Sequence, residues 1–261
     1  MGRRCLRLLG GLGLLLSLLL IGPLWLLASG QVSGGGHWSA ASRVPEGLAP
    51  TPHEAPGAVV QVYAARAWGW RGAFGVHTWL ATRRPGAETY RMHHVLSWRH
   101  PALVSQSTVS PDRAWYGNAP VLLADYRGRS AEAMIGAIEA AVAAYPLPGA
   151  YYAWPGPNSN TFTAWVTRAV PGLEVVLPVT AVGKDYLPGT VLASAPGGAG
   201  MTLSLGGLLG MTLARDEGLE LNLLGLAWGL DVRRPALKLP GIGRLGMPPV
   251  IKGHDGETRG R

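Results

Sequence analysis

Two short segments of the chain carry side chains that could perform acyl transfer together. The first, Gly75-Val76-His77-Thr78-Trp79, places a histidine in an apolar segment typical of a strand. The second, Asn158-Ser159-Asn160, stands at the expected start of a helix. A serine hydroxyl becomes a nucleophile when a histidine takes its proton, and N–H groups at a helix N-terminus can hold the developing oxyanion. We therefore predict that Ser159 is the nucleophile and His77 its base, with Asn158 and Asn160 at the oxyanion site.

A third polar group should orient the histidine, and an expected hairpin supplies one. Pro85-Gly86 indicates a turn between strands at Phe74–Thr82 and Thr89–Trp98. If the turn is centred there, paired residues have numbers that sum to about 171, which places His94 opposite His77. A slip of one residue would bring His93 there instead. We accordingly predict that His94 orients His77 as the third member of the catalytic group.

Each of these residues also has a purely structural interpretation. Ser159 could serve only as a helix cap, and His77 could be a half-buried strand residue packed beside Trp79. The tryptophans between residues 68 and 165 could line a groove for a lipid or glycan, or they could belong to the core. Among them, Trp79 and Trp154 are predicted to contact substrate. Lys184-Asp185 is either a charged pair near the site or an ion pair at a turn that contributes little.

The first thirty residues, 1–30, predict a membrane-targeting segment. Arg3, Arg4 and Arg7 precede a leucine-rich apolar run over residues 8–28. A signal peptide needs an apolar region of about 7–15 residues, and a spanning helix needs about 20. The length favours an uncleaved signal anchor, whereas Pro23 and the small residues at 28–30 suit a cleaved signal peptide. In both cases the arginines place the N-terminus in the cytoplasm and the remaining chain on the outer, periplasmic side of the cell membrane.

The composition argues against several classes of function. The formal net charge of +8 favours anionic neighbours such as phospholipid headgroups or envelope polymers. The sequence has no lysine- or arginine-rich run and no nucleic-acid-binding motif, so we expect no nucleic-acid partner. Cys5 is the single cysteine and precedes the apolar run, which leaves no thiolate ligand in the exported part. We expect no cofactor and no metal site, because His93 and His94 point to opposite faces of one strand.

The chain after the first thirty residues is expected to form a linker, one domain and a tail. Residues 31–57 are rich in glycine and proline and predict a flexible linker. Residues 58–247 predict a single globular α+β domain, and residues 248–261 a loose tail. Apolar periodicity within the domain indicates two helices and several strands. The helices are expected at Ser130–Ala144 and Ser159–Val170, and the strands at Ala58–Ala65, Phe74–Thr82, Thr89–Trp98, Leu173–Val182 and around Leu203–Leu213 and Leu219–Val232.

Five segments of the sequence resemble a bacterial family called domain of unknown function 3750. The likeness extends over residues 58–245 in outline, and it implies no particular activity. The segments are Val59–Ala67 followed by Trp68-Gly69-Trp70-Arg71-Gly72, then Val76–Trp79, Trp115–Asn118, Trp154–Phe162 and Gly183–Tyr186.

A shorter likeness is to circularly permuted papain-like proteins, such as lecithin retinol acyltransferase and the PPPDE peptidases. In these proteins a strand histidine comes first, and a helix-opening Asn-Cys-x-x-Phe segment later supplies the nucleophile. His77-Thr78 resembles the first element and Asn158–Phe162 the second, with Ser159 in the place of the cysteine. The resemblance implies a papain-like antiparallel sheet packed on two helices. Because a serine hydroxyl is far less acidic than a thiol, such a site is either a serine hydrolase or a site retained for binding.

Two functions remain open from the sequence. The first is an envelope hydrolase or acyltransferase that acts on amide or ester bonds of cell-wall peptide or lipid. The second is a non-catalytic envelope module that binds peptide, glycan or lipid, or has a structural role, and retains a degenerate cleft. The geometry of Ser159 and His77 separates them, since a catalytic pair lies within hydrogen-bond reach, about 2.6–3.2 Å, or somewhat farther apart without substrate.

Overall fold

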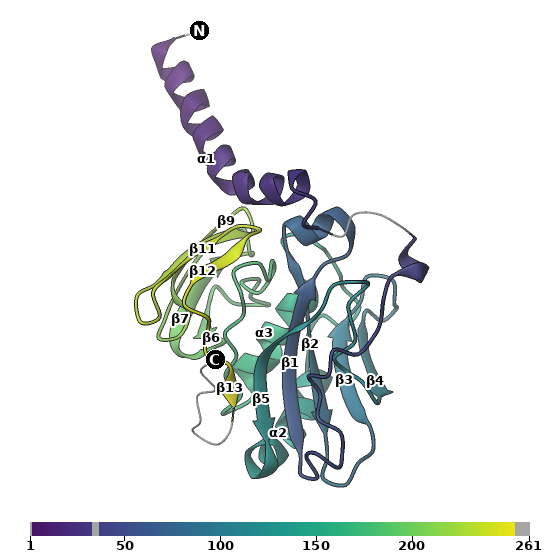
Figure 1. Cartoon of the computed structure of the whole chain (residues 1–261). Coiled ribbons are helices and arrows are strands. Elements are labelled where there is room, and N and C mark those ends of the chain that lie inside the picture. The colour runs from purple at the N-terminus through teal and green to yellow at the C-terminus, as the bar shows by residue number, and fades with distance from the viewer. Residues whose placement is uncertain (1, 33–36, 254–261) are drawn as a thin grey trace.

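The computed structural model describes residues 2–32 and 37–253. In this part of the chain an apolar helix, α1 (Arg3–Ala28), precedes two β-sheets and two further helices, α2 (Gly128–Ala143) and α3 (Ser159–Ala169) (Figure 1). The α+β class predicted from the sequence is confirmed. The second sheet was not anticipated.

The first sheet has six strands in the order β13-β5-β1-β2-β3-β4. It is antiparallel except for β13, which pairs in parallel with β5. Since β1 and β2 are paired over their whole length and buried, they form the centre of the domain. The strands are β1 (Val59–Arg66), β2 (Val76–Arg83), β3 (Tyr90–Val95), β4 (Leu103–Thr108), β5 (Val121–Arg127) and β13 (Lys252–Gly253).

Different parts of the chain cover the two faces of this sheet. On one face, α2 and α3 pack against Val60, Val62 and Ala64 of β1 and enclose the main core. On the other face, the alternate residues Val59 and Tyr63 of β1 form a second cluster with side chains of β2 and β3. Successive side chains of a strand point to opposite faces, so a strand covered on both sides has to be apolar at almost every position.

Part of the segment expected to be a flexible linker packs on the second face of the sheet. Leu48, Ala49 and Ala55 join the cluster around Tyr63. The carbonyl of Pro50 accepts hydrogen bonds from the Arg83 guanidinium and the Tyr90 hydroxyl, each at 2.6 Å. These contacts make residues 48–57 part of the folded domain, in contrast to the expectation. Residues 33–36 of the same segment lie outside the described residues.

The two domain helices lie where the apolar periodicity predicts them. At α3, the Asn158 side chain accepts the N–H of Asn160 at 2.9 Å and that of Thr161 at 3.3 Å, while the Thr161 hydroxyl accepts the Asn158 N–H. Such a capping box defines where a helix begins. α2 begins at Gly128, two residues before the expected start at Ser130, and Ser130 donates its hydroxyl to the carbonyl of Arg127.

The hairpin between β2 and β3 forms around the predicted turn, but in a different register. Ala87 donates its N–H to the carbonyl of Arg84 across Pro85-Gly86, and Gly86 has a φ of 70°, as the third position of a type II turn requires. Paired residues, such as Leu80 with His93, sum to 173 instead of 171. Glu88 and Thr89 add two residues to the second arm before β3 begins. A shift of two keeps each side chain on its face, so His77 and His94 still share one.

The second sheet is an antiparallel meander of seven strands in the order β12-β11-β10-β9-β8-β7-β6. Each of the two segments expected to be strands near the C-terminus contains a turn and forms two strands. Leu173–Val182, also expected to be a strand, has no regular secondary structure, although most of it is buried. The strands are β6 (Leu192–Ala195), β7 (Gly198–Leu205), β8 (Leu209–Ala214), β9 (Gly218–Leu223), β10 (Leu226–Asp231), β11 (Ala236–Leu239) and β12 (Gly243–Gly246).

The N-terminal helix and the C-terminal strand of the described chain both contact the domain. Among the described residues, α1 is the one helix long and apolar enough to cross a membrane. Its C-terminal part packs on a short 3-10 helix, η2 (Gly69–Ala73), where Leu26 and Ala73 share an apolar cluster. Residues 252–253 of the expected loose tail form β13, and Lys252 pairs with Glu174 and Asp216. Residues 254–261 lie outside the described part.

Candidate functional site

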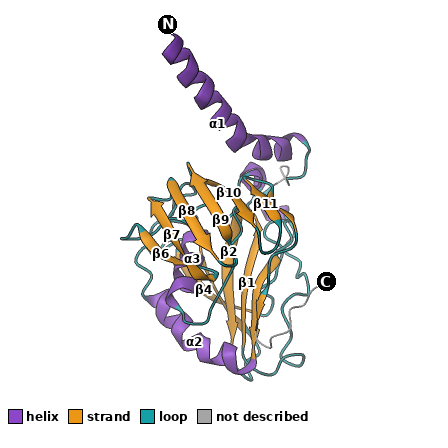
Figure 2. Cartoon of the chain, turned by 90° about the vertical axis from the view of Figure 1, so that its left-hand side faces the viewer, coloured by secondary structure: helices purple, strands orange, loops and turns teal. Residues whose placement is uncertain are grey.

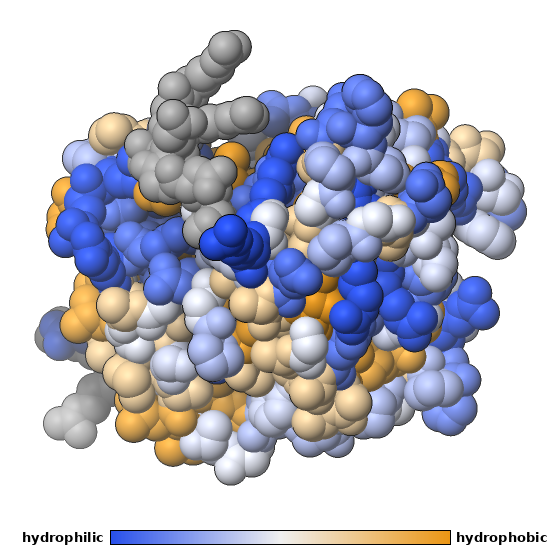
Figure 3. Space-filling view, turned by 90° about the horizontal axis from the view of Figure 1, so that it is seen from below, coloured by the Kyte–Doolittle hydropathy of each residue, from blue (hydrophilic) through white to orange (hydrophobic). Residues whose placement is uncertain are grey.

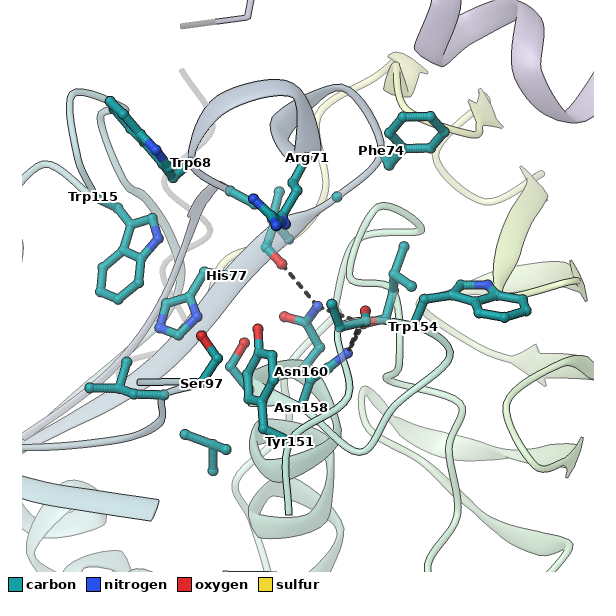
Figure 4. Close-up of a pocket in the computed structure, with 18 of the residues that line it drawn as sticks. Trp68, Arg71, Phe74, His77, Ser97, Trp115, Tyr151, Trp154, Asn158 and Asn160 are labelled. Carbon is teal, nitrogen blue, oxygen red and sulfur yellow. Dashed lines mark hydrogen bonds between the residues drawn. The ribbon is translucent and has the colours of Figure 1, made fainter. Parts of the chain in front are cut away.

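A pocket of about 680 Å³ lies where the N-terminus of α3 meets the beginning of β2. Its walls come from η2, the ends of β2 and β3, and the segments before α3 (Figure 4). Of the predicted site residues, His77, Trp154, Asn158, Ser159 and Asn160 line it. Trp79 and His94 are not among its lining residues.

Hydrogen bonds fix the start of α3 against β2. The Thr78 hydroxyl contacts the Asn160 side-chain oxygen at 3.0 Å and the backbone carbonyl of Ser159 at 3.3 Å. The Asn160 amide donates to the carbonyls of Val76, at 2.9 Å, and Val182, at 2.8 Å. The start of α3, with Ser159, is therefore held beside β2 by these contacts.

The imidazole of His77 is buried beside an aromatic side chain. The ring of Trp115 stacks on it with centroids 3.8 Å apart and planes 6° from parallel. Burial lowers the pKa of His77 well below its ordinary value, and His94 lowers it further. The imidazole is therefore neutral at neutral pH. Within the described residues, no hydrogen bond joins it to the Ser159 hydroxyl, and its Nε2 is buried without a partner.

His94 does not orient His77 as predicted. The two ring centroids are 5.8 Å apart in an edge-to-face arrangement, and both nitrogens of His94 are buried without a hydrogen-bond partner. Burial, followed by the charges of His93 and Arg99, lowers the pKa of His94 to about 4. The two-residue shift of the hairpin register explains the difference, because it places His94 diagonally from His77 instead of opposite it.

The amide side chains of Asn158 and Asn160 are not free to hold an oxyanion. Asn158 uses its oxygen to cap α3 and donates its NH₂ to the carbonyls of Ala153 and Val182. Asn160 uses its oxygen and NH₂ toward β2 and Val182. Of the first three N–H groups of α3, the cap takes those of Asn160 and Thr161. In the described part of the chain, the N–H of Ser159 is the one that remains for a ligand.

The two tryptophans predicted to contact substrate have different positions. Trp79 is 1% exposed, stacks on Tyr63 and donates its indole N–H to the carbonyl of Pro111 at 2.9 Å. It belongs to the core, because the face of β2 on which it lies is covered by residues 48–57 and 111–115. Trp154 is exposed at the pocket, and its indole N–H donates to the carbonyl of Leu224 at 2.7 Å.

The pocket wall is rich in aromatic side chains, which the sequence analysis predicted only in general terms. Arg71 is the one arginine or lysine among the described residues that line it, and it stacks over Trp70 at 5.1 Å. Ser97 lies beside His77 in Figure 4 and brings a second serine hydroxyl to the pocket. Aromatic residues next to turn-forming glycines, as in residues 68–72 and 115–117, are the sequence signal for such a wall. The aromatic residues that line it are Trp68, Trp70, Phe74, Trp98, Trp115, Tyr116, Tyr151 and Trp154.

The Lys184-Asp185 pair is buried, unlike an ion pair at a turn surface. Lys184 contacts Asp185 at 3.2 Å and Glu220 at 2.7 Å, and Lys238 contacts Glu220 at 2.6 Å. These side chains join the segment after α3 to the inner face of the second sheet and do not line the pocket. Among the described residues, no group of three or more His, Cys, Asp or Glu side chains is placed to hold a metal ion.

The fold and site together define an α+β protein with an N-terminal apolar helix and an aromatic pocket at the start of α3. Residues 57–186 match the model of the family described as Protein of unknown function (DUF3750), and the chain belongs to this family. The predicted membership is thus confirmed, and the matched part contains the pocket residues up to Val182. No curated protein and no solved structure matches the chain. The resemblance to papain-like proteins is confirmed by none of these comparisons and stays a prediction.

Proposed function

We propose that the protein is a membrane-anchored envelope protein whose aromatic pocket binds an amphiphilic, anionic lipid. The observation that carries the proposal is the composition of the pocket wall: eight aromatic side chains surround about 680 Å³, with Arg71 as the one arginine or lysine on the described wall. Aromatic rings offer large apolar surfaces, and Trp and Tyr add a polar tip at one end. A wall of this kind fits a hydrocarbon chain, and the guanidinium fits an anionic headgroup.

The position of η2 relative to α1 supports a lipid over a soluble ligand. Trp70 and Arg71 of η2 face the pocket, while Ala73 of the same short helix packs on Leu26 of α1. Figure 4 shows α1 passing close to this wall of the pocket, near Phe74. If α1 crosses the membrane, η2 lies at the membrane surface, where Trp side chains are favoured. A lipid can then reach the pocket from the adjacent leaflet.

Photo-crosslinking tests this proposal on the full chain in lipid nanodiscs. The probe is a phosphatidylglycerol with a diazirine on one acyl chain, and mass spectrometry identifies the labelled residues. We expect labels at the pocket and about tenfold less capture by Trp98→Ala, since losing an aromatic contact costs about 1.4 kcal/mol or more. Trp38→Ala is the matched control, because Trp38 and Trp98 are each 56% exposed and only Trp98 lines the pocket.

A second comparison tests the role of charge. Arg71→Gln should weaken capture of phosphatidylglycerol but not of a diazirine phosphatidylcholine, whereas Arg84→Gln at the distant β2–β3 turn should change neither. Labels spread evenly over the surface, with equal capture by all four variants, would contradict lipid binding in the pocket.

Acyl transfer by Ser159 is a second candidate function, and the presence of Ser159 and His77 at one pocket favours it. Ser159 and His77 line the same pocket, and burial keeps His77 neutral and able to accept a proton. The Ser159 oxygen would attack the carbonyl of an ester or amide while His77 takes its proton. His77 would then protonate the departing alcohol or amine, leaving an acyl group on Ser159 for transfer to water or another alcohol.

Labelling by a fluorophosphonate distinguishes the two candidates. Acyl transfer predicts a label on the full chain that Ser159→Ala abolishes and that Ser97→Ala retains, because both serines line the pocket and only Ser159 begins α3. Lipid capture without any such label, and unchanged in Ser159→Ala, assigns the pocket to binding alone.

A further inference from the structure

The second sheet presents its apolar side to the outside and its polar side to the protein. Along β7, Met201, Leu203 and Leu205 are exposed, whereas the alternate residues Thr202 and Ser204 are buried. The other strands of the sheet continue the pattern in register. Leu203 pairs with Met211, Met211 with Leu221, and Leu221 with Trp228. A parallel row joins Met201, Leu213, Leu219, Leu230, Leu237 and Leu245 across six strands. We call these two rows the outer apolar face.

Contacts on the inner side fix this orientation of the sheet. Glu220 pairs there with Lys184 and Lys238, and Asn222 donates its amide to Asp185 at 3.0 Å. Thr202 and Thr212 are hydrogen-bonded to each other at 2.9 Å. If the sheet were turned over, the ion pair between Glu220 and Lys184 could not form and the segment after α3 would be exposed. The apolar face is therefore on the outside. A contiguous apolar surface of this extent marks an interaction site.

We propose that the outer apolar face is a homodimer interface, covered by the same face of a second copy of this chain. The six strands that carry these rows, at a spacing of about 4.8 Å and each about five residues long, give a footprint of about 29 by 17 Å, or about 500 Å². Two copies therefore bury at least about 1,000 Å², and projecting side chains raise the accessible area toward the 1,200–2,000 Å² of specific interfaces. Two flat aliphatic faces that pack about 10 Å apart form a β-sandwich.

The position of α1 indicates that the outer apolar face is covered by a second copy of the chain and not by the bilayer. Figure 2 looks toward the side of the molecule that carries the second sheet, and α1 leaves at the top of this view without crossing the sheet. A bilayer crossed by α1 then lies beyond one end of the sheet instead of against its face. A copy anchored in the same membrane stands beside the first, with the two-fold axis along the membrane normal and both α1 helices on one side.

The remaining surface offers a contrast to this face. Figure 3 shows the end of the molecule opposite α1, where hydrophilic and hydrophobic residues are mixed. Isolated apolar residues on such a surface are ordinary. Val109 lies in the loop after β4, outside the second sheet, and is 65% exposed, more than Leu221 at 49%. It provides a matched control for accessibility.

Cysteine crosslinking in membranes tests the dimer on the full chain. Cys5→Ser removes the native thiol, and Leu221→Cys then places a thiol on β9, the middle strand of the sheet. A bismaleimide that spans about 10 Å, the spacing of packed sheets, should yield a species of twice the chain mass. Val109→Cys should yield none. Adding Leu213→Asp should abolish the crosslinked species, whereas adding Val109→Asp should leave it unchanged.

Each other outcome overturns the proposal. If Leu221→Cys reacts with a water-soluble maleimide as fast as Val109→Cys, the face is open to water. If it is protected from that reagent, forms no dimer and reacts with a lipid-borne maleimide, the bilayer covers it. A crosslinked species of any other mass assigns the face to a different protein. Leu221→Cys removes little apolar area, so the test does not depend on whether Leu213→Asp folds.

Discussion

Glu220 should be one of the side chains on which the stability of this protein depends most. Its two oxygens contact the ammonium groups of Lys184, at 2.7 Å, and Lys238, at 2.6 Å, and none of the three side chains is more than 4% exposed. Burial lowers the pKa of Lys184, but the carboxylates of Asp185 and Glu220 raise it above the ordinary value. Lys184 is therefore charged inside the protein, and Glu220 is the carboxylate that both lysines contact.

Glu220→Gln retains the shape of the side chain and removes this compensating charge. Lys184 keeps Asp185 at 3.2 Å, whereas Lys238 keeps, among residues 2–32 and 37–253, only the carbonyl of Glu217 as a hydrogen-bond partner. Breaking a buried ion pair typically costs about 3–5 kcal/mol. For a domain of about 200 residues, each kcal/mol lowers the melting temperature by about 2–4 °C, so we expect a decrease of about 6–20 °C.

The measurement is thermal unfolding of the full chain in detergent, followed by tryptophan fluorescence. Glu139→Gln is the control, because Glu139 also forms an ion pair, with Arg84, but on the surface, where such pairs contribute about 0–1 kcal/mol. Equal melting temperatures for the two variants would refute the reasoning. The quadruple variant Lys184→Met, Asp185→Asn, Glu220→Leu, Lys238→Met should recover most of the loss, since it removes the paired charges together.

Three further predictions concern the pocket, the histidines and the anchor. Asn158→Ala should lower stability by about 2–4 kcal/mol, because four hydrogen bonds are lost, and Asn158→Asp should restore the part due to the helix cap; chemical unfolding of both variants checks this. His94 has a folded-state pKa of about 4 against an ordinary 6.5, so the unfolded chain binds its proton first as pH falls. Its contribution is fully present above pH 6.5, decreases by about 3 kcal/mol by pH 4 and is then constant. His94→Gln should remove this part of the pH dependence in unfolding titrations, whereas the parts due to His77 and His93, whose pKa values burial also lowers, should remain. Because the apolar run has the length of a membrane span, the mature protein should keep its N-terminus and resist carbonate extraction; an N-terminus at residue 31 would show a cleaved signal instead.

Local patterns in the sequence were sufficient to predict several elements of the fold. The arginines and leucines of the first thirty residues specify α1, since an apolar run of that length forms a helix without help from the remaining chain. Asn158 and Thr161 specify the first residue of α3 because a capping box is a contact within one turn. β1 and β2 follow from runs of apolar, β-branched residues between turns. Ser159 and His77 were therefore correctly placed on a helix start and a strand.

The strand register, and the segments that meet at the pocket, could be known only from the tertiary structure. The two extra residues of the β2–β3 turn changed the register and separated His94 from His77, and turn chemistry alone does not fix how many residues follow a turn before pairing begins. The pocket wall gathers Arg71, Ser97, Trp115 and Trp154 from four separate segments, and no spacing in the sequence predicts such a meeting.

The second sheet shows most clearly what a sequence pattern does not determine, namely which face of a sheet is buried. Residues 198–231 alternate polar and apolar side chains, so the sequence determines that their strands have one face of each kind. Alternation does not determine which face turns inward, and the usual assumption that the apolar face does so is wrong for this sheet. Lys184 and Asp185, from a segment far away in the sequence, contact the polar face, and the leucines are therefore on the outside. The reason is energetic: a buried charge without a partner costs more free energy than an apolar face exposed to water.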